Sequence, residues 1–87
     1  MNIEDINEPI TVRADFGGGK VTPRMFKRVG AAAGHTYKVT TVNGRWVDRE
    51  GDHPTYHFSV QADGDTYYIC LTTVDMMWRL EKVMVGG

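Results

Sequence analysis

The chain has little cysteine, little proline and no long apolar run: its 87 residues include one cysteine, Cys70, and three prolines. A single cysteine cannot close an internal disulfide, which argues against a disulfide-stapled secreted scaffold. A membrane-spanning helix needs roughly 18–20 consecutive apolar residues, and no segment approaches that length. The first residues are acidic and lack the apolar stretch of a signal peptide. These absences predict a cytoplasmic protein with no membrane contact.

The composition is that of a folded domain, with 41% hydrophobic and 24% charged residues. A chain of this length is expected to form one domain. Residues 1–8 are polar and acidic and precede Pro9, which predicts a flexible leader. Residues 9–85 are expected to form a single β domain, followed by a flexible tail at residues 86–87.

Several segments have the period-two pattern of half-buried strands. Apolar and polar residues alternate over residues 10–16, 55–62 and 66–71. The Asp and Gly residues at 63–65 form a turn sequence between the last two segments. This pattern predicts a β-hairpin over residues 55–71.

A second hairpin is predicted around Asn43 and Gly44, a dipeptide that favours a type I′ turn because both positions tolerate positive φ. Its strands would be residues 35–42 and a return strand that begins at Arg45. The small residues at 30–34 are expected to be a connector.

The C-terminal segment has two interpretations. Residues 72–75 resemble a capping box, which would begin a helix running through Met84. Alternatively, Trp78 and Leu80 point inward from a last strand. We favour the strand, because the preceding hairpins need a partner to close the sheet.

Short strands joined by Gly, Asn and Asp turns predict an all-β domain. The expected fold is a small five- to seven-stranded antiparallel barrel or strongly bent sheet, SH3-like or similar, with one short C-terminal helix as the alternative ending. Four aromatic residues are expected to supply much of the core: Trp46, Phe58, Tyr67 and Trp78.

The formal net charge of -1 conceals an asymmetry along the chain. Residues 20–49 carry a net charge of +6, whereas residues 1–19 carry -3 and residues 50–87 carry -4. Aromatic residues lie among the basic ones. Basic side chains neutralise phosphates and aromatic rings stack on bases, so this composition suits nucleic-acid binding. It equally suits a solvated surface paired with the acidic segments.

The leading functional hypothesis is a non-enzymatic β-barrel module that contacts nucleic acid or an acidic protein surface. The residues expected to bind phosphate or carboxylate are Arg24, Lys27, Arg28, Lys38 and Arg45, with Tyr68 or an exposed Phe26 stacking. The alternative is an accessory protein that acts by edge-strand addition or self-association. The oligomeric state is left open.

Motifs for phosphate binding and catalysis fail on their spacing. Gly19 and Lys20 suggest a phosphate-binding loop, but Val21 stands where that motif needs Ser or Thr. Cys70 lies in an apolar strand, where a thiol is more often inert packing than a nucleophile, and no serine has a nucleophile-elbow context. The sequence therefore predicts no enzyme activity and no cofactor.

His53, His57 and Cys70 are three candidate zinc ligands. A structural zinc site usually takes four ligands. The candidates for the fourth are Asp48, Glu50, Asp52 and His35. Because Pro54 and a strand intervene, the two histidines need not point the same way, and the sequence prediction is no metal site.

The terminal Gly86 and Gly87 resemble the tail of ubiquitin-like sulfur carriers, which makes a carrier a further alternative. Carriers of that kind have a β-grasp fold with a long helix after the first hairpin. No helix of that length fits residues 17–35, which contain several glycines and Pro23.

A wider resemblance rests on single aromatic and glycine positions across residues 22–83. They are Pro23 to Phe26, Gly30, Tyr37 to Val39, Val42, Trp46 and Trp78 to Leu80. In these the chain resembles a small uncharacterised bacterial β domain associated with DNA-repair operons and translesion-polymerase-like proteins. It departs from that domain at residues 17–19 and 31–33. The resemblance implies a strand-rich fold and a setting close to DNA, without a mechanism.

Overall fold

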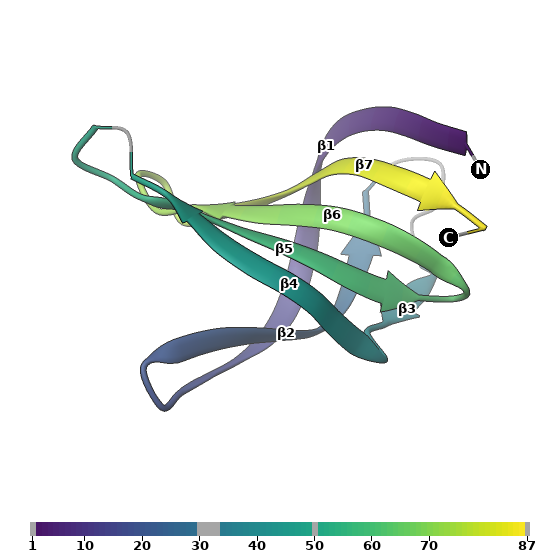
Figure 1. The fold of residues 1–87 in the computed structure, drawn as a ribbon, viewed down its shortest axis with the longest axis horizontal. Coiled ribbons are helices and arrows are strands. Elements are labelled where there is room, and N and C mark those ends of the chain that lie inside the picture. The colour runs from purple at the N-terminus through teal and green to yellow at the C-terminus, as the bar shows by residue number, and fades with distance from the viewer. Residues whose placement is uncertain (1, 30–33, 50, 87) are drawn as a thin grey trace.

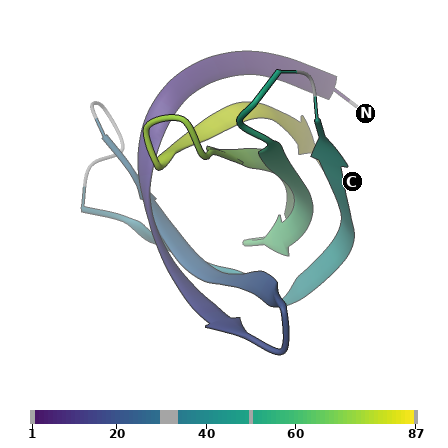
Figure 2. The ribbon, with the colours of Figure 1, turned by 90° about the vertical axis from the view of Figure 1, so that its left-hand side faces the viewer.

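The computed structural model describes residues 2–29, 34–49 and 51–86. Within these residues the chain forms seven strands and no helix: β1 (Asn2–Gly17), β2 (Lys20–Arg28), β3 (Thr36–Lys38), β4 (Thr41–Asp48), β5 (Thr55–Ala62), β6 (Asp65–Thr72) and β7 (Met77–Val85). Neighbouring strands pair antiparallel in one sheet, in the order β3-β2-β1-β7-β6-β5-β4. The sheet curls into a half-barrel, which confirms the predicted all-β barrel or bent sheet (Figures 1 and 2).

The hairpin predicted over residues 55–71 is confirmed as β5 and β6. Their register runs from Thr55 opposite Thr72 to Ala62 opposite Asp65. Asp63 and Gly64 make the turn with φ of 51° and 82°, a conformation that Gly adopts without strain and Asp tolerates. The alternating apolar residues face the interior, so the sequence pattern set the orientation of this hairpin.

The core lies inside the curl of the sheet. Phe26 on β2 stacks on Tyr37 of β3, with ring centroids 4.8 Å apart, and the edge of Tyr67 on β6 meets both rings. The other buried apolar residues of this cluster are Ile10, Phe58, Val60, Ala62, Ile69, Leu80 and Val83. Complete burial of one such large side chain contributes about 1.5–3 kcal/mol to folding.

Backbone hydrogen bonds tie the two ends of the sheet together at one corner. Between β3 and β4, the amide of Val39 donates to the carbonyl of Arg24 on β2, and the amide of Thr40 donates to that of Gln61 on β5. β3 pairs only with residues 25–27 of β2, and β4 pairs with β5. The sheet is therefore joined at this corner, whereas residues 20–22 of β2 pair with β1 but not with β3 or β4.

The hairpin predicted at Asn43 and Gly44 is wrong. Both residues lie within β4, where the register shifts between Val42 and Gly44, and the chain instead changes direction around Val39 and Thr40. A bulge can occupy the same Asn-Gly sequence as a turn, and pairing with the buried strand β5 decided between them. Trp46 consequently lies outside the core, 47% exposed, contrary to the expectation.

Both ends of the domain form paired strands. Of the leader predicted at residues 1–8, the part from Asn2 onward belongs to β1, and Asn2 lies opposite Val85 of β7. The favoured C-terminal strand is confirmed as β7, which lies between β1 and β6. Apart from Gly34, the expected connector at 30–34 lies outside the described residues. In the part of the chain that the structure describes, a search for a helix able to cross a membrane finds none.

Candidate functional site

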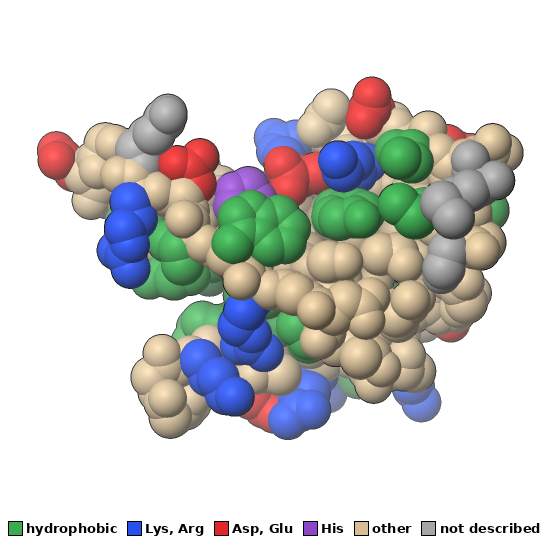
Figure 3. All heavy atoms as spheres, viewed as in Figure 1, with side chains coloured by type: hydrophobic (Ala, Val, Ile, Leu, Met, Phe, Trp, Pro, Cys, Tyr) green, Lys and Arg blue, Asp and Glu red, His purple; other side chains and the backbone are tan. Residues whose placement is uncertain are grey.

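The open side of the half-barrel forms a cleft of about 560 Å³. It lies between the tip of the β1–β2 hairpin and strands β4 to β6, and we call it the open cleft. Its apolar walls include Phe16, Val21, Val47, Phe58, Leu71 and Met76. Figure 3 shows a hollow at the left of the molecule, with hydrophobic side chains within it and Lys and Arg side chains at its margin.

Arg45 spans the opening. Its Nη1 donates a hydrogen bond of 2.9 Å to the backbone carbonyl of Val21 on β2, and its guanidinium lies 5.8 Å from the centre of the Phe58 ring. Val21 lies outside the part of β2 that β3 covers. A side chain thus takes the place that a neighbouring strand would occupy at this carbonyl.

The mouth of the open cleft leaves large apolar side chains in contact with solvent. Phe16 is 66% exposed and Met76 61%, and Val47 and Trp46 are more than one-third exposed. Single exposed apolar residues are common on proteins, whereas a group of them around one cleft makes that cleft a candidate binding site.

The predicted basic residues are not brought together on one face. Arg24 forms an ion pair with Asp15 at 2.6 Å, and the partly buried Arg28 forms an ion pair with Glu8. The hydrogen bond to Glu8 is the main reason that the pKa of Arg28 is raised, and desolvation by burial partly opposes it. Arg45 lies across the opening on β4. The positive charge of the middle third is therefore partly neutralised and spatially divided.

Lys27 and Lys38 do lie close together, on the outer face of β2 and β3. Lys38 is opposite Met25, which is opposite Arg13 of β1, so the three strands bring Arg13 into the same group. Within the described residues, no ion pair involves these three side chains, which we call the outer basic group. Sequence reasoning missed Arg13 because it belongs to the acidic first segment, although alternation had placed it on the outer face.

The two predicted stacking residues have different outcomes. Phe26 is 1% exposed in the core, so its prediction as a contact residue is wrong. Apolar residues occur on both faces of β2, so the alternation pattern did not show which face is buried. Packing of Phe26 on Tyr37 buries the face that carries Phe26. Tyr68 is half-buried on the outer face of β6, where Lys82 Nζ lies 4.9 Å from its ring centre. It is not part of the outer basic group.

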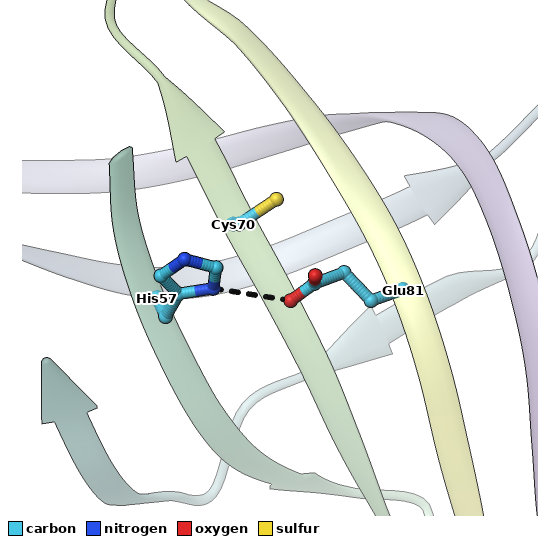
Figure 4. A group of neighbouring side chains, drawn as sticks. All are labelled: His57, Cys70 and Glu81. Carbon is cyan, nitrogen blue, oxygen red and sulfur yellow. Dashed lines mark hydrogen bonds and ion pairs between the residues drawn. The ribbon is translucent and has the colours of Figure 1, made fainter. Parts of the chain in front are cut away.

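A second cluster lies on the outer face of β5, β6 and β7 (Figure 4). His57 is directly opposite Cys70 across the β5–β6 ladder, which places both side chains on one face. Glu81 occupies a bulge in β7, between Leu80 opposite Ile69 and Lys82 opposite Tyr68. The ligand atoms of the three residues lie within 4.8 Å of one another, and we call them the His–Cys–Glu cluster.

Local contacts hold this cluster. His57 Nδ1 lies 3.2 Å from Glu81 Oε1, and the indole of Trp46 lies parallel to the imidazole with ring centroids 5.4 Å apart. Burial, followed by the charge of Glu81, raises the pKa of Cys70 to about 11, with Arg79 acting in the opposite direction. The thiol is therefore protonated near neutral pH and is a poor nucleophile there.

The zinc set weighed from the sequence is only partly assembled. His57 and Cys70 meet, but His53 is exposed between β4 and β5 and is absent from the His–Cys–Glu cluster. Glu81 takes the place of His53. Sequence spacing did not reveal Glu81, because it lies on β7 and contacts His57 of β5 across the intervening strand β6. Outward alternation along residues 78–81 was the only available signal for it.

At the C-terminal tail, the amide of Gly86 donates to Asp65 Oδ1, while Gly87 lies outside the described residues. The carrier hypothesis stays a prediction. The helix of a β-grasp fold is not found among the described residues.

Comparison with protein-family models, curated proteins and solved structures finds no match to this chain. The resemblance to a DNA-repair operon domain therefore stays a prediction.

Proposed function

We propose that the protein is a binding module whose open cleft accepts an extended acidic segment of a partner protein as an added strand between β2 and β4. The observation that carries the proposal is the hydrogen bond from Arg45 to the carbonyl of Val21. An arginine that bonds an unpaired edge carbonyl is also placed to bond a carboxylate of an incoming segment.

The backbone supports strand addition. β4 is the last strand of the sheet, and residues 20–22 of β2 lie beyond the reach of β3. Unpaired amides and carbonyls at sheet edges bind extended peptides by continuing the ladder. Here an added strand would have edges on both sides of it.

The side chains around the open cleft define the chemistry of the partner. Alternate residues of an added strand would point inward, toward the apolar walls formed by residues such as Phe16 and Val47. Lys20 and Arg45 also line the cleft, and an acidic segment would complement their charge. The expected ligand therefore alternates apolar and acidic residues.

The experiment is a heteronuclear NMR titration with an end-blocked peptide of about eight residues in which valine and glutamate alternate. Amide shifts are expected at residues 20–22 and 44–48. A peptide of alternating valine and lysine is the control. Equal binding of the two peptides, or shifts confined to residues far from the cleft, would contradict the proposal.

Paired variants locate the interaction. Arg45→Glu is expected to weaken binding at least about tenfold by opposing the peptide's charge, and Lys27→Glu on the outer face is expected to have little effect. Phe16→Ser is expected to weaken binding. Ile3→Ser, at a residue also more than half exposed on the same strand but outside the cleft lining, is not. Sedimentation is expected to show a monomer; a dimer would mean that a second copy occupies the opening.

The outer basic group favours a second candidate, single-stranded nucleic acid on the outer face of β1 to β3. Arg13, Lys27 and Lys38 are adjacent there without acidic partners among the described residues. A labelled oligonucleotide titrated at low salt tests it, and Lys27→Glu should then weaken binding while Arg45→Glu leaves it unchanged. Each lost phosphate contact should reduce the salt slope by about 0.7 for a single strand. No binding at low salt would overturn this candidate.

A further inference from the structure

We infer that His57, Cys70 and Glu81 form a binding site for a zinc ion on the outer face of the sheet. Of these residues, His57 also lines the open cleft, whereas Cys70 and Glu81 do not. Imidazole nitrogen, thiolate sulfur and carboxylate oxygen are the three donor types that zinc takes in proteins. The sulfur and nitrogen donors disfavour calcium and magnesium, which prefer oxygen ligands.

Paired strands supply the framework of the site. All three residues come from paired strands, with His57 opposite Cys70 and Glu81 delivered by the bulge in β7. Zinc bonds of about 2.0–2.3 Å in a tetrahedron place ligand atoms about 3.3–3.8 Å apart. The three ligand atoms already lie within 4.8 Å of one another, so side-chain rotations suffice to close the site.

The thiol of Cys70 supplies an independent observation. Cys70 is 5% exposed, and within the described residues no hydrogen bond to its sulfur is found. Cys70 lies on β6 between His57 on β5 and Glu81 on β7 (Figure 4), and its sulfur is within 4.8 Å of their ligand atoms. On binding, the S–H bond breaks, the S–Zn bond forms and the proton leaves to solvent.

The surroundings complete a metal site. The parallel indole of Trp46 fixes the plane of the His57 ring. A hollow beside the cluster is lined by Asp5, Asn7, Tyr68 and Lys82. Three protein ligands leave a fourth tetrahedral position, which water or the Asp5 carboxylate can occupy from this hollow.

The test is a titration of the untagged, reduced full chain with Zn²⁺, followed by calorimetry, and with Co²⁺, followed by absorption. One ion per chain is expected, with Co²⁺ giving a thiolate-to-metal charge-transfer band and the visible bands of tetrahedral cobalt. Co²⁺ is also expected to quench Trp46 fluorescence, and Trp46→Phe should remove that quenching more than Trp78→Phe does.

Variants assign the ligands. His57→Ala, Cys70→Ser and Glu81→Gln are each expected to weaken binding at least about tenfold, and His53→Ala should leave it unchanged. Circular dichroism verifies folding, and Glu81→Gln keeps the test decisive if Cys70→Ser unfolds. Asp5→Ala distinguishes carboxylate from water as the fourth ligand. Absence of binding at micromolar Zn²⁺, a cobalt spectrum without the thiolate band, or equal losses for His53→Ala and His57→Ala would overturn the inference.

Discussion

The rings of Trp46 and His57 lie 3° from parallel, with centroids 5.4 Å apart, on the outer surface of β4 and β5. The two residues are directly opposite each other in the ladder. This cross-strand stack explains how a tryptophan expected in the core is held outside it. Trp46 and His57 line both the open cleft and the hollow beside the His–Cys–Glu cluster. The stacked pair therefore lies between these two sites.

The two tryptophans are predicted to differ in their contribution to stability. Trp46→Ala is expected to reduce the free energy of unfolding by about 1 kcal/mol, since the ring is partly exposed and loses mainly its stacking. Trp78→Ala should cost about 3 kcal/mol, because Trp78 packs against the core and Phe58. Urea unfolding followed by far-ultraviolet circular dichroism measures both. Equal losses would contradict the exposed position of Trp46.

Phe26 is predicted to be a core residue. Phe26→Ala should lower the free energy of unfolding by about 3–5 kcal/mol, through lost burial and a cavity beside Tyr37 and Tyr67. Phe16→Ala, at an exposed position on β1, should change it by about 0.5 kcal/mol. Chemical denaturation of the two variants makes the comparison. A stable Phe26→Ala protein would show that this ring is not part of the core.

Alanine substitutions of Gly64 and Gly44 are predicted to differ, because Gly64 lies in the confirmed β5–β6 turn and Gly44 lies within β4. Gly64→Ala is expected to cost about 1–2 kcal/mol, because φ is 82° in the β5–β6 turn. Gly44→Ala should cost little, since φ at Gly44 is not positive and nothing lies within 4 Å of the added methyl group. Thermal unfolding of both variants tests this difference. A larger loss for Gly44→Ala would restore the type I′ turn at Asn43 and Gly44.

Tyr67 is predicted to ionise late. Burial, with smaller contributions from nearby Tyr37 and acidic residues, raises its pKa from 10.0 to about 12. The neutral phenol is favoured in the folded state, so this contribution to stability is complete below pH 10 and is lost as pH rises toward 12. Ultraviolet titration should show a tyrosine that ionises near pH 12. The Tyr67→Phe variant should lack that late transition; if it persists, the assignment to Tyr67 is wrong.

Much of the fold could be predicted from local sequence patterns. Strict alternation over residues 55–62 and 66–71 allows only one orientation of β5 and β6, because a one-residue slip would bury polar side chains. The pattern around Phe26 predicted less, because apolar residues occur on both faces of β2. The turn at Asn43 failed for another reason: pairing of β4 with the buried strand β5 outweighed a local turn preference.

The candidate sites were less predictable than the strands. The opening exists because β3 ends at Lys38 and the next strand, β4, lies at the opposite end of the sheet. No local sequence pattern encodes this placement of β3 and β4. The His–Cys–Glu cluster joins residues on three strands, and a bulge in β7 aims Glu81 into it. Linear spacing instead suggested His53, which is nearer in sequence but outside the cluster.

The absence of long apolar runs and the presence of a lone cysteine already determined a small domain without disulfides, and alternation determined its strands. These properties are local, since each depends on composition or on neighbouring residues. Only the tertiary structure decided where the basic side chains of the +6 middle segment lie. Arg24 and Arg28 pair with Asp15 and Glu8, Lys20 and Arg45 line the open cleft, and Lys27 and Lys38 lie on the outer face. Charge and ligand geometry act through space, so they depend on strand order and register, which a sum along the chain does not contain.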